Sequence, residues 1–134
     1  MDKLTPEQRS ALMRKIRHKD TRPEVAVRSR LHRLGYRFRL HRQNLPGKPD
    51  LAFVSRKKAI FIHGCFWHGH DCRAGRNRPV TNTQYWQGKR RRNRERDARS
   101  IAELSAQGWT AMTVWECELR NIDRLVRRVT DFLS

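Results

Sequence analysis

The segment from His63 to Cys72 gathers the side chains of this chain that are best suited to bind a metal or to move a proton. Within ten residues it holds three of the six histidines and two of the three cysteines, next to two large aromatic residues. Thiolate and imidazole groups at short spacing are typical ligands of a tetrahedral zinc site. Cys65, His70 and Cys72 supply three such ligands, which leaves His63 and His68 available for proton transfer.

A tetrahedral site needs a fourth ligand, and Cys117 is the remaining cysteine of the chain. It follows a strand that the sequence predicts over residues 109–115. With four protein ligands the coordination shell is full, which indicates a structural zinc ion without an open position for substrate or water. The alternative is that Cys117 is a small buried residue that binds no metal.

The charge of the chain indicates the kind of partner. The net charge is +18 over 134 residues, from 31 Lys and Arg against 13 Asp and Glu, and such a field attracts polyanions, nucleic acid first. No apolar stretch of about 18 residues is present, so we expect no membrane partner. An odd number of cysteines, three, argues against a disulfide framework, and the N-terminus lacks the apolar stretch of a secretion signal. We therefore expect a cytoplasmic location.

Capping signals and hydrophobic periodicity predict a single α/β domain over residues 1–134, in which residues 1–20 form an N-terminal helical arm. The first two helices start with capping boxes, at Thr5 and Thr21. The expected order is helix, helix, strand, strand, strand, helix, strand and helix, over about residues 5–17, 21–35, 36–40, 51–54, 59–62, 81–107, 109–115 and 121–133.

Asp50 lies where a turn leads into the second predicted strand, directly after Pro49. A carboxylate in such a position can hold Mg²⁺, which takes one or two carboxylates, waters and substrate phosphate. A lone aspartate after a proline is also an ordinary turn residue. The element order, with Pro-Asp at the head of the second strand, is that of the restriction-endonuclease-like nucleases. We therefore expect this α/β fold, with a mixed central sheet flanked by helices.

Five motifs extend this likeness to one family: Asp20-Thr21-x-x-Glu24, Leu45-Pro46-Gly47-Lys48-Pro49-Asp50, Phe61-Ile62-His63-Gly64-Cys65-Phe66-Trp67-His68, Asn93-x-x-Arg96-Asp97 and Val114-Trp115-Glu116-Cys117. With them the chain resembles the Vsr family, the very-short-patch-repair DNA mismatch endonucleases, from about Arg14 to Arg120. The resemblance implies a bacterial enzyme that requires Mg²⁺, carries a structural Zn²⁺ and nicks one strand of duplex DNA. The nick falls 5′ to the thymine of a T:G mismatch, the lesion left when 5-methylcytosine deaminates, and it starts very short patch repair.

The resemblance also implies roles for individual residues. Asp50 and the backbone carbonyl of Ile62 would bind Mg²⁺, and His68 would orient or deprotonate the attacking water. His63 and Glu24 would complete the active site. Glu24 has a strong alternative role, because in Thr21-x-x-Glu24 it can close a capping box. The family's zinc ligands match the four residues that the cysteine count selects: Cys65, His70, Cys72 and Cys117.

DNA contacts are expected at three places. By resemblance, Phe66 and Trp67 form an aromatic wedge that enters the base stack beside the mismatch, and Met13 inserts from the opposite groove. The wedge residues could instead belong to the core, although two adjacent aromatics on an extended chain point opposite ways. The basic run of residues 89–96 lies on the long helix, and it is expected to contact phosphates or else to be a solvated face. Its DNA-binding candidates are Lys89, Arg92 and Arg96.

The chain departs from the related sequence patterns at two places, and two alternative functions remain open. Phe61-Ile62-His63 stands where the wider nuclease superfamily has an acid-x-Lys pair, and Ile62 stands where typical Vsr-like proteins have threonine. The chain could be a related nuclease with a different DNA target, or a zinc-stabilised DNA-binding module without catalysis. The preferred partner is duplex DNA with a T:G mismatch, bound by a monomer, and the downstream repair proteins are left open.

Overall fold

The computed structural model describes residues 21–68, 70–72 and 83–134. The predicted first helix and Met13 therefore lie outside the described residues. The helices, strands and 3-10 helices (η) are α2 (Arg22–Arg33), β1 (Arg39–Leu40), β2 (Leu51–Phe53), η1 (Val54–Arg56), β3 (Lys58–His63), α3 (Cys65–His68), α4 (Thr83–Ala106), β4 (Thr110–Trp115), η2 (Glu116–Asn121) and α5 (Ile122–Leu133).

The strands form one mixed sheet in the order β1-β2-β3-β4. β1 and β2, and β2 and β3, pair antiparallel, with Leu51 opposite Ile60. β3 and β4 pair parallel, with His63 opposite Trp115, and α4 is the helix of the crossover between them. The predicted α/β fold with a mixed sheet is confirmed.

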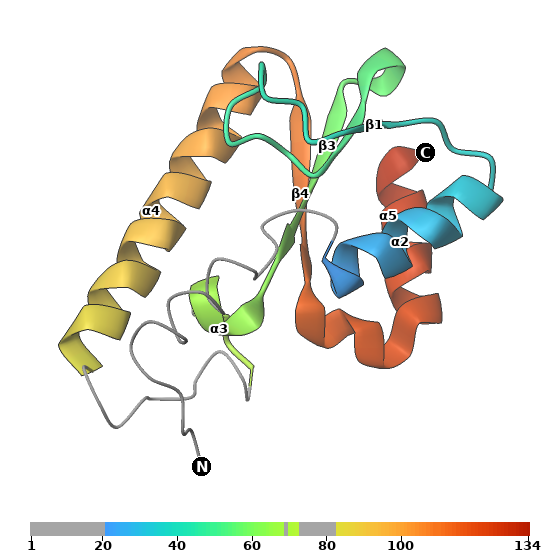
Figure 1. The fold of residues 1–134 in the computed structure, drawn as a ribbon. Coiled ribbons are helices and arrows are strands. Elements are labelled where there is room, and N and C mark those ends of the chain that lie inside the picture. The colour runs from blue at the N-terminus through green and yellow to red at the C-terminus, as the bar shows by residue number, and fades with distance from the viewer. Residues whose placement is uncertain (1–20, 69, 73–82) are drawn as a thin grey trace, which may run out of the picture.

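Helices cover both faces of the sheet. α4 lies along one face, while α2 and α5 lie together on the opposite face (Figure 1). Because successive strand residues point to opposite faces, one set of apolar residues packs under α2 and α5 and another under α4. The α2–α5 side holds the larger core, made of Val27, Leu31, Leu51, Phe53, Ile60, Met112, Val114, Leu125, Val129 and Leu133.

The layer under α4 is built from smaller side chains. Ala52 and Ala59 are fully buried there, next to Phe61 and to Leu104 of α4. Alanines at these positions let the long helix approach the sheet closely. The turn before Asp50 also packs on α4, since a Cβ on Gly47 would lie 2.6 Å from the Cβ of Ser100. Gly47 has a φ of 75° as well, so both backbone conformation and space require glycine.

Local structure corrects two sequence interpretations. The capping box at Thr21 is wrong, because the Thr21 side chain makes no capping hydrogen bond and Glu24 turns inward to hydrogen-bond His41. The argument that Phe66 and Trp67 point opposite ways on an extended chain does not apply, because both lie in the short helix α3. The strand expected over residues 36–40 is reduced to Arg39–Leu40. The other predicted helices and strands that lie in the described residues fall within a few residues of their predicted bounds.

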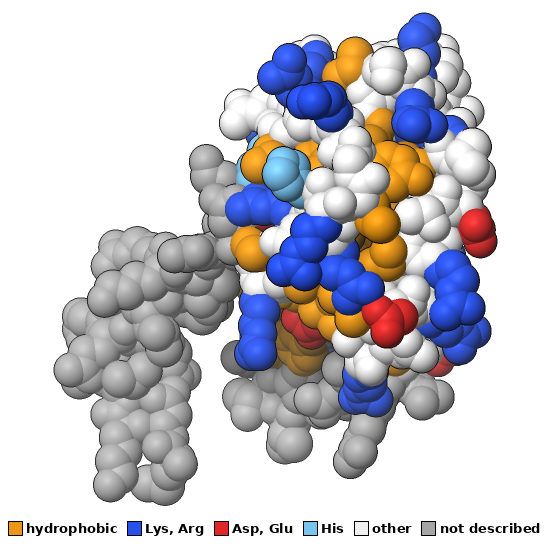
Figure 2. Space-filling view, turned by 90° about the vertical axis from the view of Figure 1, so that its right-hand side faces the viewer, with side chains coloured by type: hydrophobic (Ala, Val, Ile, Leu, Met, Phe, Trp, Pro, Cys, Tyr) orange, Lys and Arg blue, Asp and Glu red, His pale blue; other side chains and the backbone are white. Residues whose placement is uncertain are grey.

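Lysine and arginine side chains spread over the surface of the molecule. On the face that carries α2 and α5 they surround a band of hydrophobic side chains, with few acidic groups between them (Figure 2). Val25 and Leu34 of α2 are among the exposed hydrophobic residues. Over the described residues, no helix has both the length and the apolar character needed to span a membrane.

Candidate active site

The three cysteines and one histidine meet at the end of the two parallel strands. Since His63 and Trp115 are paired, the segments that follow β3 and β4 start side by side, and they carry Cys65 and Cys117. The ligand atoms of Cys65, His70, Cys72 and Cys117 all lie within 4.8 Å of one another. The Cys117 Sγ is 3.6 Å from the His70 Nδ1, and the Cys117 N–H donates to the Cys65 Sγ at 3.4 Å.

This thiol cluster has the chemistry of a metal site. Burial raises the pKa of Cys65 to about 12 and also raises the pKa of Cys117, which lies beside Cys72. A divalent cation stabilises the thiolate form that such buried groups otherwise avoid. The imidazole of His70 stacks on Trp115, with ring centroids 4.1 Å apart, which fixes its orientation. The four side chains could hold a metal ion, and sulfur with imidazole suits zinc.

Asp50 lies at the same end of the sheet, beside the last residues of β3. The β2–β3 pairing ends at Leu51 and Ile60, so the backbone of Ile62 extends beyond β2. There the Ile62 N–H donates to the Asp50 Oδ2 at 2.7 Å. In a strand the N–H and C=O of one residue point to the same side, so the Ile62 carbonyl faces the open edge next to Asp50. The two predicted magnesium ligands are thus neighbours.

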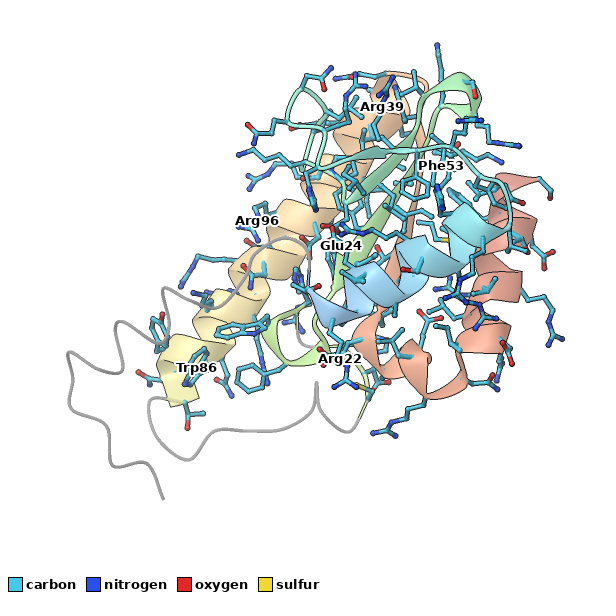
Figure 3. The ribbon with its side chains drawn as sticks, turned by 45° about the vertical axis from the view of Figure 1, so that its right-hand side comes forward. Arg22, Glu24, Arg39, Phe53, Trp86 and Arg96 are labelled. Atoms are coloured by element: carbon cyan, nitrogen blue, oxygen red, sulfur yellow. The ribbon has the colours of Figure 1, made fainter. Side chains whose placement is uncertain are left out.

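Glu24 and His41 complete a second cluster around Asp50. Glu24 is 1% exposed, and its Oε1 is 2.5 Å from the His41 Nε2, while its Oε2 is 3.7 Å from an Arg28 guanidinium nitrogen. One ligand atom each of Glu24, His41 and Asp50 lies within 4.8 Å of the others. Figure 3 shows Glu24 on the first turn of α2, directed toward the centre of the molecule. Burial, together with the Glu24 carboxylate, raises the pKa of Asp50 to about 6.

His41 was missed by the sequence analysis. It lies in the turn after β1, in none of the family motifs, and its backbone is left-handed with a φ of 49°. Its backbone N–H donates to the Asp50 carbonyl at 3.1 Å, which ties the turn to the start of β2. Nothing in the sequence around a histidine in a turn indicates that its side chain reaches Glu24.

His63 and His68 form a stacked pair held by an aspartate. Their rings are 3.8 Å apart and parallel within 2°. The Asp97 Oδ2 is 2.5 Å from the His68 Nδ1 and 3.7 Å from the His63 Nδ1. Burial and the neighbouring His68 lower the pKa of His63 to about 4. Although burial raises the pKa of Asp97, the hydrogen bond with His68 and the charges of both histidines hold that pKa below its usual value.

Asp97 thereby sets the tautomer of His68. With Nδ1 bound to a carboxylate, the Nε2 of His68 is the atom left to accept a proton from water. Asp97 stands in one of the quoted family motifs, but the sequence analysis assigned it no role. Its signal was its place in the motif Asn93-x-x-Arg96-Asp97.

The wedge candidates Phe66 and Trp67 lie on α3 against the first turns of α4. Both are partly exposed, and each packs against Trp86, with ring centroids 5.4 and 5.3 Å apart. α4 also holds their backbone, because Arg90 donates to the Phe66 carbonyl and Asn93 to the Trp67 carbonyl, at 2.7 and 2.8 Å. Trp86, which had no predicted role, extends this aromatic group on α4 (Figure 3).

The basic run on α4 divides into inner and outer residues. Arg90 is buried, and its guanidinium carbon lies 4.3 Å from the ring centre of Phe66. Lys89 is partly exposed, 5.4 Å from the ring of Trp67, while Arg92 and Arg96 are exposed. The three DNA-binding candidates therefore remain accessible, whereas Arg90 supports the aromatic group.

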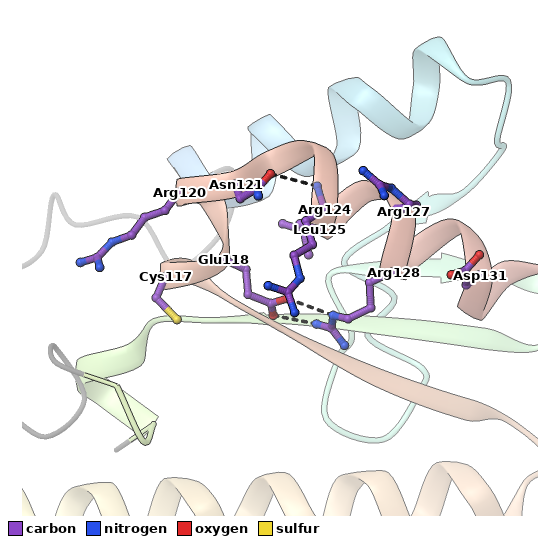
Figure 4. Close-up of a pocket in the computed structure, with 9 residues that line it drawn as sticks. All are labelled: Cys117, Glu118, Arg120, Asn121, Arg124, Leu125, Arg127, Arg128 and Asp131. Atoms are coloured by element: carbon purple, nitrogen blue, oxygen red, sulfur yellow. Dashed lines mark hydrogen bonds and ion pairs between the residues drawn. The ribbon is translucent and has the colours of Figure 1, made fainter.

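A basic hollow of about 590 Å³ lies on the other side of Cys117, along η2 and α5 (Figure 4). Arg128 is held there by Glu118, with nitrogen–oxygen distances of 2.9 and 2.6 Å. Its further arginines are Arg120, Arg124 and Arg127. The hollow contains none of the catalytic candidates.

The fold and the site together define a class of protein. An aspartate at the head of β2, next to the parallel pair β3–β4 and its crossover helix α4, is the arrangement of the restriction-endonuclease-like nucleases. A histidine, His63, occupies the end of β3 where other members of this class use an acid and a lysine. The thiol cluster is an addition that ties β3 to β4.

The comparisons with known proteins identify the family. Residues 1–74 match the family model described as DNA mismatch endonuclease Vsr. The chain is 52% identical over 133 residues to the type II nicking enzyme V.XorIIP of Xanthomonas oryzae pv. oryzae, covering 99% of this chain and 97% of that protein. It is 42% identical over 124 residues to the DNA mismatch endonuclease Vsr of Escherichia coli, covering 92% of this chain and 77% of that protein. This chain therefore belongs to the Vsr family, and the predictions of the family and of an endonuclease are confirmed.

Proposed function

We propose that this endonuclease nicks one strand of duplex DNA 5′ to the thymine of a T:G mismatch, with Mg²⁺ as its catalytic cation, and so starts very short patch repair. The observation that carries the proposal is the meeting of Asp50, the histidine pair and a partly exposed aromatic group at one end of the sheet. The printed names of the two relatives, a mismatch endonuclease and a nicking enzyme, support this reaction.

In the proposed mechanism Asp50 and the Ile62 carbonyl would hold the cation. When bound, Mg²⁺ neutralises the charge that grows on the scissile phosphate. The Ile62 N–H donates to the Asp50 Oδ2 and so fixes the orientation of this carboxylate. Isoleucine in place of threonine at position 62 keeps the backbone carbonyl, so this ligand survives the change.

His68 is proposed as the group that receives the proton of the attacking water. Asp97 holds its Nδ1 and stabilises the imidazolium that forms, as a carboxylate behind a catalytic histidine does. His63 stacks on His68, and its lowered pKa keeps it neutral near pH 7, so it adds no positive charge that would oppose protonation of His68. Glu24 is proposed to act in the water network around Asp50.

Mismatch selection is proposed to come from Phe66 and Trp67. A mispaired step costs less to unstack than a paired one, so aromatic side chains that enter the stack favour the defect. Lys89, Arg92 and Arg96 lie on the adjacent helix and are proposed to neutralise phosphates. Cys65, His70, Cys72 and Cys117 are proposed to bind a structural Zn²⁺ that holds α3, and with it the aromatic pair, in place.

The test uses duplexes with a single T:G pair in varied flanking sequence, with each strand end-labelled separately. Incubation with Mg²⁺ is expected to cut the thymine strand alone, and omission of Mg²⁺ to stop the reaction. Cutting of fully matched duplexes at equal rate would replace this target with a matched recognition site. Mismatch binding without any cutting would instead support a DNA-binding module. Binding as a monomer, in the DNA-containing bacterial cytoplasm, belongs to the same proposal.

A further inference from the structure

Phe66, the first residue of the aromatic pair, is held by two residues of α4. The Arg90 Nε donates to the Phe66 carbonyl at 2.7 Å, and the Arg90 guanidinium carbon lies 4.3 Å from the centre of the Phe66 ring. The centre of the Trp86 ring lies 5.4 Å from the same ring, with the two ring planes inclined by 67°. Trp86 and Arg90 are four residues apart, so they are neighbours on the surface of the helix. One turn of α4 thus contacts both the backbone and the ring of Phe66.

Arg90 differs from the other cations of the basic run. Its exposed fraction is 5%, whereas Arg91, Arg92 and Arg94 are exposed. Removal of a guanidinium group from water is costly, so a buried arginine is expected where its contacts compensate for the lost hydration. Two such contacts, the hydrogen bond and the ring contact, are both made to Phe66. Arg90 is therefore better placed to orient Phe66 than to contact a phosphate.

A fixed ring is an advantage for a side chain that enters a base stack. A mobile side chain loses conformational freedom on insertion, whereas a ring that is already held loses less. Unstacking costs less at a mispaired step than at a paired one, so insertion is favoured in the T:G duplex. The contacts that orient Phe66 should therefore strengthen binding of the T:G duplex more than binding of a matched duplex.

We propose that Arg90 is a positioning residue for mismatch selection, which holds the carbonyl and the ring of Phe66 in the orientation that enters the base stack. The inference rests on the proposed function, because it takes Phe66 as part of the wedge, and it adds a residue that sets the strength of the mismatch preference. His68 is held separately, since its Nδ1 lies 2.5 Å from the Asp97 Oδ2. Loss of Arg90 should therefore reduce the mismatch preference and leave proton transfer nearly unchanged.

The test compares Arg90→Met, which keeps the apolar stem, with Arg90→Lys, which keeps a cation and an N–H donor. Affinities for a T:G duplex and for the matched duplex are measured by competition, and the single-turnover nicking rate is measured on saturated T:G duplex. For Arg90→Met the ratio of the two affinities should fall about fivefold, with the matched-duplex affinity and the nicking rate within about twofold of the parent. Arg90→Lys should restore most of the lost preference.

Hydrogen exchange of the free, zinc-loaded full chain gives a readout that needs no DNA. Arg90→Met should speed exchange of the α3 amides by about fivefold or more and leave exchange in β3 unchanged. Arg99→Met, which removes an exposed cation farther along α4, is the matched control and should change neither readout. Melting temperatures check that each variant is folded, and Arg90→Gln supplies a second neutral side chain if Arg90→Met is destabilised.

The outcomes separate this inference from the proposed function. A parent protein that prefers the T:G duplex, with the same preference in Arg90→Met, would overturn the role of Arg90 alone. Unchanged exchange of the α3 amides in Arg90→Met would also overturn it. A parent protein without any T:G preference would overturn the proposed function and this inference together.

Discussion

The two clusters at the end of the sheet bring ligand groups together in different ways. The thiol cluster takes three of its four ligands from the short segment between Cys65 and Cys72, and only Cys117 comes from elsewhere. The cluster of Glu24, His41 and Asp50 takes each residue from a different element. Short spacing makes the first cluster visible in the sequence, whereas the second exists only because the sheet folds.

The surroundings of the two clusters also differ. The thiol cluster brings four potential metal ligands together just beyond the ends of β3 and β4. The Asp50 cluster lies where β3 extends beyond β2, and there the Ile62 N–H donates to Asp50 instead of to a neighbouring strand. We expect the thiol cluster to stabilise the fold and the Asp50 cluster to take part in the reaction. The predictions below separate these two roles, from the largest expected effect to the smallest.

Cys117→Ser tests the thiol cluster and should have the largest effect on folding. Loss of a thiolate ligand should reduce zinc content and lower the free energy of unfolding by about 3 kcal/mol or more, because structural zinc binding contributes directly to folding. Zinc content by elemental analysis and thermal melting of the same samples provide the measurement. Ser105→Ala, an exposed change on α4, is the control. An unchanged zinc content would mean that another group is the fourth ligand.

Asp97→Asn tests the proton-transfer pair without touching either cluster. Asparagine can still hold the His68 ring, but it does not stabilise the imidazolium, so the single-turnover nicking rate should fall about 100-fold. Mismatch affinity should change little. Glu95→Gln, which removes an exposed acid from the same helix, is the matched control. A normal nicking rate for Asp97→Asn would exclude Asp97 from the mechanism.

Trp67→Ala tests whether the aromatic group near the thiol cluster selects the mismatch. Stacking on a base contributes about 1–3 kcal/mol, so the preference for a T:G duplex over a matched duplex should narrow about tenfold. The ratio of the two affinities, measured by competition, cancels general losses of DNA binding. Equal loss on both duplexes would make Trp67 a core or general binding residue.

Ile62→Thr should have the smallest effect. The proposed magnesium ligand at this position is the backbone carbonyl, so the nicking rate should change by less than about threefold. The loss of apolar packing should lower the free energy of unfolding by about 1 kcal/mol, since Ile62 packs against the core. Magnesium titrations of the nicking rate compare the two proteins. A large change in magnesium affinity would show that the side chain matters.

Features with local signals could be predicted from the sequence. The mixed α/β fold followed from hydrophobic periodicity and from the position of Asp50, and the four thiol-cluster residues from the small number of cysteines. Their predicted proximity agrees with the structure. In each case the signal lies within a few residues, or in a residue type that is rare in the chain.

Features that depend on tertiary contacts could not be predicted. His41 lies in an irregular turn, and only the packing of that turn beside α2 brings it to Glu24. Asp97 reaches His68 only through the position of α4 against α3. The alternative role of Glu24 was to close a helix cap, but a buried contact with His41 competes with that local bond. The spacing of Thr21 and Glu24 does not show whether Glu24 bonds to the helix terminus or to His41.

The central claim, that the Asp50 cluster is catalytic, is tested most directly by Asp50→Ala. Single-turnover nicking and equilibrium binding would be measured on one T:G duplex, with Mg²⁺, for the variant and the parent protein. We predict that nicking is lost while mismatch affinity stays within a few-fold, since Asp50 holds the cation and not the DNA bases. A variant that still nicks at the parent rate would contradict the account and remove Asp50 from the mechanism.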